Sequence, residues 1–114
     1  EACASGELKH GPIALVTDEV PTVALVPKDA LYHKMVSNIQ EILARNGKVI
    51  AVATEGDEDI KQHCTDVIYV PKVGDVLYPF LTTVAVQLLA YHIANFRECD
   101  IDKPRNLAKS VTVE

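Results

Sequence analysis

A lysine near the end of the chain is the residue whose surroundings most favour chemistry. Lys109 stands in an apolar setting made by Leu107, Ala108 and Val111, with Arg105 close by in the sequence. A lysine amine becomes a nucleophile when desolvation or a neighbouring cation lowers its pKa. This segment offers both conditions, so we expect it to dock into a groove. The alternative is a surface lysine on a solvated terminus, the usual state of chain ends.

His10 is the second candidate, because it directly precedes Gly11 in a glycine-flanked turn. Imidazole titrates near neutral pH, which suits general acid–base catalysis. The remaining histidines lie in polar helical segments or on a long apolar helix. We expect His33 and His63 to be solvated, and His92 on the apolar helix to be a hydrogen-bonded structural residue.

Other groups of reactive side chains favour structural roles. The acidic run Asp57–Asp59 is typical of a helix N-terminus, where the macrodipole favours carboxylates, and not of a metal site. The three cysteines are far apart and form no CxxC pair, which predicts free thiols in a reducing cytoplasm. Neither a metal nor another cofactor is predicted, since nucleotide-loop and metalloprotease motifs are absent from the sequence.

Composition limits the class of protein. The chain has 114 residues, enough for one small domain, and a net charge of −5. That charge, without a basic cluster, argues against nucleic acid as a partner. No uninterrupted apolar stretch approaches the roughly 18–20 residues that span a bilayer, so no membrane association is predicted. No secretory signal is visible at the start.

The order of predicted elements is typical of an α/β fold. Apolar runs predict three buried strands, at 21–27, 48–54 and 66–71. Helical periodicity predicts two main helices, at 30–46 and 76–97. Strands alternating with helices indicate a parallel sheet with right-handed crossovers and helices on both faces. Three strands make a narrow sheet, so a partner chain or upstream sequence should complete it.

Several local signals set the ends of these elements. Asp29 is the expected N-cap of the first main helix, Gly47 its expected stop, and Pro79 fits the first turn of the last helix. That last helix is apolar around much of its circumference and should be buried on more than one side. A helix end stopped by Gly6 is expected at the start, and 55–64 should form a short solvent-facing helix.

Two motifs give the chain a family resemblance. The turn GELKHGP at 6–12 and the ending PRNLAKSVTVE at 104–114 closely resemble those of the glutamine–fructose-6-phosphate aminotransferases, also called glucosamine-6-phosphate synthases. The resemblance extends over essentially the whole chain. It implies a flavodoxin-like sugar-isomerase (SIS) fold, with the later half of a second SIS domain at 1–97 and a catalytic tail at 98–114.

The resemblance also implies roles for particular residues. Lys109 matches the lysine that forms a Schiff base with open-chain fructose 6-phosphate, and His10 matches the histidine that opens the cyclic sugar. That histidine comes from a second subunit, which implies a homodimer. Ala108 and Val111 are the implied substrate-binding residues. The implied product is glucosamine 6-phosphate, whose amino nitrogen comes from glutamine through a glutaminase domain that this sequence does not include. The resemblance also implies that the enzyme is cytoplasmic.

Two other readings remain open for the sequence. One is a non-catalytic SIS module that binds a phosphosugar, and the other is a different SIS isomerase, acting on arabinose phosphate or sedoheptulose phosphate. Neither accounts for Lys109 in an apolar ending. The phosphate-binding loops, the first SIS domain and the proton-shuttling residues of the family are missing, so the chain alone is expected to be inactive.

Overall fold

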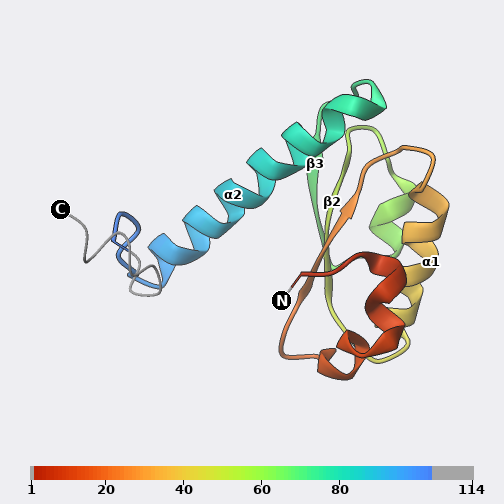
Figure 1. The fold of residues 1–114 in the computed structure, drawn as a ribbon, viewed down its shortest axis with the longest axis horizontal. Coiled ribbons are helices and arrows are strands. Elements are labelled where there is room, and N and C mark those ends of the chain that lie inside the picture. Colours follow the sequence, from red (N-terminus) through yellow and green to blue (C-terminus); the bar gives the residue numbers. More distant parts are fainter. Residues whose placement is uncertain (1, 104–114) are drawn as a thin grey trace. The chain divides into compact units, whose positions relative to one another are not determined.

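The structure is a computed structural model that describes residues 2–103, in two units that divide after Thr82. The first unit contains a parallel sheet in the order β1-β2-β3, with β1 at Thr22–Val26, β2 at Val49–Thr54 and β3 at Asp66–Val70 (Figure 1). Helix α1, Tyr32–Leu43, connects the first two strands, and the 3-10 helix η3, Asp59–Gln62, connects the next two. The predicted α/β class and parallel strands are therefore confirmed.

One face of this sheet carries the core. Side chains alternate between the faces of a strand, so every second residue of each strand points to the same layer. On this face the strands contribute small and branched residues, and α1 contributes its apolar stripe. The buried cluster comprises Leu8, Ala24, Val26, Tyr32, Ile39, Ile42, Val49, Ala51, Ala53 and Ile60.

The opposite face of the sheet is less well covered. Val23 and Leu25, which alternate with the core residues of β1, are 40% and 42% exposed. Val52 and Val70 on the neighbouring strands are buried. The prediction of strands buried on both faces thus holds for β2, the middle strand, and is wrong for β1, which is an edge strand.

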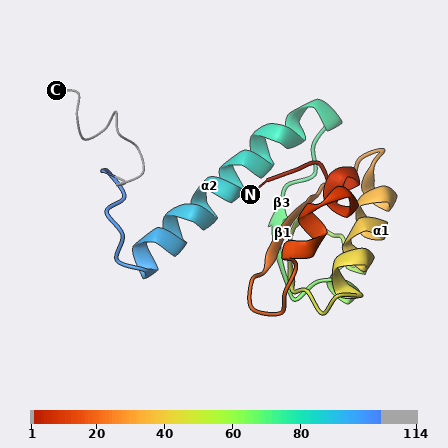
Figure 2. The ribbon, with the colours of Figure 1, turned by 60° about the horizontal axis from the view of Figure 1, so that its bottom comes forward.

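Two short helices precede the sheet: η1 at Ser5–His10 and η2 at Pro12–Leu15. Both are 3-10 helices, and η1 lies beside α1 in both views (Figures 1 and 2). The prediction of a helix stopped by Gly6 is wrong, because η1 begins at Ser5 and includes that glycine. The predicted solvent-facing helix at 55–64 is reduced to η3, and its Ile60 is fully buried in the core.

The predicted ends of α1 differ from those in the structure, where the N-cap is Leu31 and not Asp29. Asp29 Oδ1 accepts a hydrogen bond from the backbone N–H of Leu31 at 2.8 Å, just before the helix starts. At the other end Asn46, and not the predicted stop Gly47, takes the left-handed conformation common after helices, with φ 59°. Gly47 is needed for space instead. A Cβ atom there would lie 2.5 Å from Cγ1 of Val16 and 2.6 Å from Cγ2 of Ile42.

The last helix is interrupted near its start. A short 3-10 helix, η4 at Asp75–Leu77, leads into α2 at Tyr78–Phe96, and Pro79 lies in the first turn of α2 as predicted. The predicted burial on more than one side is wrong, because only Tyr78 and Thr82 of α2 are buried. Large apolar side chains along this helix are exposed: Phe80, Val84, Val86, Leu88, Tyr91, Ile93 and Phe96.

Helix α2 is long and apolar enough to span a bilayer, although polar residues interrupt its apolar run as the sequence indicates. The segment Asp75–Phe96 has 22 residues and contains an 18-residue window with a mean hydropathy of 1.5, so it could cross a membrane by length and composition. Its polar residues Thr82, Gln87 and His92 break the apolar run but carry no fixed charge, which keeps the hydropathy high. A single such helix is weak support for a membrane span, since helices of α/β cores have similar compositions. The absence of membrane association stays a prediction.

The packing around Gly47 gives a test of the fold. Gly47→Ala places a methyl group against Val16 and Ile42, and should lower the free energy of unfolding by about 1–3 kcal/mol through overpacking. Gly74→Ala is the matched control, because a Cβ atom at Gly74 meets no atom within 4 Å. Urea unfolding of both variants measures the difference. Equal stability of the two would contradict the close packing described here.

Candidate functional site

His10 is the last residue of η1, and its side chain is exposed. Gly11 follows it with φ 156° and ψ −59°, and separates η1 from η2. The turn is held against α1 by two contacts. Leu8 is buried in the core, and Asn38 Nδ2 of α1 donates a hydrogen bond to Ser5 Oγ at 2.8 Å. An exposed imidazole on an anchored turn is open to a substrate or to another subunit.

The predicted nucleophile cannot be placed in the same way. Lys109, with the predicted substrate-binding residues Ala108 and Val111, lies outside the described residues. The beginning of the predicted tail is described as far as residue 103. There the carboxylate of Asp100 accepts hydrogen bonds from the backbone N–H groups of Asp102 and Lys103, at 3.1 and 2.9 Å. The boundary at 97/98 stays a prediction.

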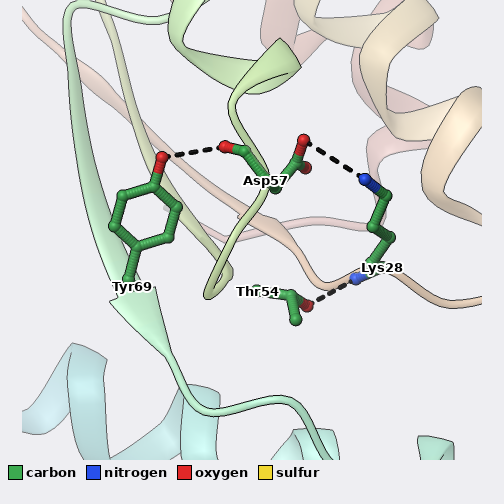
Figure 3. A network of polar contacts seen from close by, with 4 residues as sticks. All are labelled: Lys28, Thr54, Asp57 and Tyr69. Carbon is green, nitrogen blue, oxygen red and sulfur yellow. Dashed lines mark hydrogen bonds and ion pairs between the residues drawn. The ribbon is translucent and has the colours of Figure 1, made fainter.

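A polar network at the carboxyl ends of the strands was not found by sequence reasoning (Figure 3). The backbone N–H of Lys28, just after β1, donates to Thr54 Oγ1 at the end of β2 at 2.8 Å. The Tyr69 hydroxyl on β3 donates to the backbone carbonyl of Asp57 at 2.8 Å. Lys28 Nζ lies 3.6 Å from Asp57 Oδ1. These contacts connect the segments that follow β1 and β2 to each other and to β3.

Asp57 is the unusual member of this network, because it is only 1% exposed. Neither of its carboxylate oxygens accepts a hydrogen bond from the described residues, so the half-exposed ammonium of Lys28 is the counter-charge. Burial, and next the Asp57 carboxylate, raise the pKa of the Tyr32 phenol above its ordinary value. The same two causes raise the pKa of the Cys64 thiol to about 11. The acidic run lies at the start of a short helix, η3, as predicted, with Glu58 as its N-cap. The burial of Asp57 and its ion pair with Lys28 were not predicted.

A topological signal could have located this network. The carboxyl ends of parallel strands meet at one edge of the sheet, so residues just after β1 and β2 become neighbours there. Lys28 and Asp57 occupy such positions. Metal binding does not follow, because residues 2–103 contain no group of three or more His, Cys, Asp or Glu side chains placed to hold an ion.

The other reactive side chains range from exposed to half-buried. His33 on α1 and His92 on α2 are exposed, and each contacts a tyrosine ring edge to face. His63 is half-buried just after η3. All three cysteines are free, as predicted: Cys3 and Cys99 are exposed and Cys64 is half-buried.

Comparison with known proteins gives the class that this fold and turn define. The SIS domain family matches residues 1–95, and the chain belongs to that family. Among solved structures, the C-terminal domain of glucosamine-fructose-6-phosphate aminotransferase from Francisella tularensis superimposes with a TM-score of 0.77 at 40% identity. That match covers 89% of this chain and 29% of the other.

The curated relatives are more specific. Glutamine–fructose-6-phosphate aminotransferases [isomerizing] are 59% identical to this chain in Thermus thermophilus, 54% in Methanosarcina mazei and 48% in Chlorobaculum tepidum. Each match includes the whole of this chain, which spans 18–19% of the length of these relatives. The resemblance inferred from the two motifs is thereby confirmed, and the SIS fold with it. The two alternative readings are not favoured.

The ion pair at the sheet edge yields a stability test. Lys28→Met leaves the Asp57 carboxylate buried without a counter-charge, and should lower the free energy of unfolding by about 1–3 kcal/mol. This is less than for a fully buried pair, because Lys28 is half exposed. Urea unfolding of Lys28→Met, Asp57→Asn and the double variant measures the coupling, and the double variant should lose less than the sum of the singles. Strict additivity would contradict the pairing.

A matched control exists for this cycle. Lys61→Met removes a lysine whose partner Glu58, at 2.7 Å, is exposed, so its effect should be much smaller than that of Lys28→Met.

The thiol of Cys64 yields a pH test. Alkylating reagents react with the thiolate and not with the thiol. Burial, and next the Asp57 carboxylate, raise the pKa of the Cys64 thiol to about 11. Below that pH the thiolate fraction falls about tenfold per pH unit, so Cys64 should react with iodoacetamide far more slowly at pH 8 than the exposed Cys3. Its rate should keep rising up to about pH 11. Mass spectrometry of the alkylated peptides measures both rates, and equal rates at pH 8 would refute this environment.

Proposed function

We propose that the chain is the C-terminal part of the isomerase region of an enzyme that makes glucosamine 6-phosphate from fructose 6-phosphate and glutamine. The observation that carries this proposal is identity of 48–59% along the entire chain to isomerizing aminotransferases of which it spans about a fifth. The similarity to the solved C-terminal domain of glucosamine-fructose-6-phosphate aminotransferase supports a C-terminal position within such an enzyme.

Lys109 is the proposed nucleophile. Its neutral amine adds to the ketone carbon of open-chain fructose 6-phosphate, and loss of one water gives an imine and holds the sugar covalently. An ammonium ion cannot make this attack because it has no lone pair. The apolar residues around it, among them the proposed substrate-contacting Ala108 and Val111, favour the neutral amine by desolvation.

His10 is the proposed acid–base catalyst of ring opening. Opening the cyclic sugar requires removal of a proton from the anomeric hydroxyl and delivery of a proton to the ring oxygen, and an imidazole can do both near neutral pH. Its exposure at the end of η1 supports access by a sugar. We propose that it acts on the sugar held by a second copy, in a homodimer of the cytoplasm.

The remainder of the protein is proposed to supply what this chain lacks. An upstream segment would extend the sheet at the free edge of β1. It would also cover Val23 and Leu25 on the exposed face and the apolar surface of α2, and bring the phosphate-binding loops and a glutaminase domain. On this proposal the 114-residue chain alone turns over no sugar. Measurable glucosamine 6-phosphate production by the isolated chain would contradict it.

Chemical trapping tests the role of Lys109. Sodium borohydride reduces an imine to a stable secondary amine, so the full-length protein incubated with radiolabelled fructose 6-phosphate and borohydride should gain label at Lys109. Lys109→Arg should abolish the label and reduce sugar conversion at least about a thousandfold, since arginine stays protonated and cannot form the imine. Lys103→Arg is the matched control and should retain both. Retained labelling in Lys109→Arg would refute the mechanism.

A further inference from the structure

The short helix η1 contacts α1 through two residues, and both lie on the same side of η1. A 3-10 helix has 3.0 residues per turn, so residues three apart in sequence eclipse one another. Ser5 and Leu8 are three apart and therefore share a stripe. Leu8 enters the core that contains Ile39 and Ile42 of α1, and Ser5 Oγ accepts the hydrogen bond from Asn38 Nδ2 at 2.8 Å.

The contacts of Leu8 and Ser5 restrain η1 in different ways. A buried leucine holds η1 on the core, but an apolar contact has no directional preference and leaves the helix free to rock about it. A hydrogen bond has a preferred direction and length, and this one joins side chains 33 residues apart in sequence, both of them half-buried. Together the two contacts fix the rotation of η1 about its own axis.

The rotation of η1 decides where His10 points. His10 is two residues beyond Leu8, which in a 3-10 helix places it about 120° away from the stripe that faces α1. This position agrees with its exposure, and with the exposure of Glu7, three residues earlier on the same stripe. A turn of η1 therefore moves the imidazole of His10 by a rotation of the same size.

We propose that Asn38 is a positioning residue for His10, acting through its hydrogen bond to Ser5. The inference rests on the proposed function, because His10 needs a fixed direction only if it transfers a proton to or from the sugar. A misplacement of about 1 Å in a reacting group can reduce a rate by about a hundredfold. Loss of one hydrogen bond on a turn that keeps its leucine anchor should have a smaller effect.

Kinetics of the full-length protein test this role. Asn38→Ala should reduce kcat for conversion of fructose 6-phosphate about tenfold, with KM nearly unchanged, because the substrate still binds and His10 is misdirected. Ser5→Ala removes the other half of the same bond and should give the same loss. Ser5→Thr keeps the hydroxyl and should retain activity. Gln40→Ala, an exposed amide on the same helix, is the matched control and should behave as wild type.

A double variant separates positioning from general stability. If Asn38 acts through His10, adding Asn38→Ala to His10→Gln should reduce the rate no further. His10→Gln should remove one limb of the pH profile of kcat, and Asn38→Ala alone should weaken that same limb. A full additional tenfold loss in the His10→Gln background would overturn the proposal. So would wild-type kcat in Asn38→Ala.

Two further readouts keep the outcome decidable. If Asn38→Ala unfolds, Asn38→Asp serves instead, because its carboxylate can accept a hydrogen bond from the Ser5 hydroxyl, and it should restore most of kcat. Failure of that variant, in a protein that still hydrolyses glutamine normally, would overturn the proposal. Wild-type turnover in His10→Gln would refute the proposed role of His10 itself, whereas a slow His10→Gln beside a fully active Asn38→Ala would refute only the positioning role.

Discussion

The packing of α1 on one face of the parallel sheet is the constraint on which the other features depend. Ile39 and Ile42 belong to the same buried cluster as Ala24 and Ala51 of the two strands that α1 connects. Alanine at these strand positions lets a helix approach closely, and Gly47 lets the chain turn back under Ile42 without a clash. The main buried cluster lies on one face of the sheet, so a displacement of α1 would disturb the residues that pack on it.

Two polar features are attached to α1 at different points. Near its start, Tyr32 lies in the core within the electrostatic influence of the buried Asp57 carboxylate. Further along, Asn38 holds the turn that carries His10. A buried charge is a poor source of stability, since its desolvation offsets most of the attraction. The Lys28–Asp57 pair is better understood as a fixed connection between two loops at the sheet edge, with stability lost when either partner is removed.

The sequence predicted the elements well where the signal was local. Proline-bounded apolar runs located β1 and β3, and apolar periodicity located α1, because these patterns reflect burial within a few residues of chain. The burial of Asp57 was not predicted because its partner Lys28 is 29 residues away and the acidic run gives no sign of burial. The exposed surface of α2 could not be predicted either. Periodicity reports which residues favour burial, and it does not report whether the partner surface belongs to the same stretch of chain.

The candidate site shows the same contrast between local signals and contacts that are distant in sequence. Lys109 and His10 were both predicted from residue type and motif, but only the structure shows that the helix carrying His10 is bound to α1 by the hydrogen bond from Asn38 to Ser5. On the proposed function this connection matters at an early step. A cyclic sugar has no free ketone, so an amine can condense with it only after the ring has opened. Under that proposal, the direction of the His10 imidazole would limit how much open-chain substrate reaches Lys109, and the anchoring of η1 on α1 would affect both steps of the reaction.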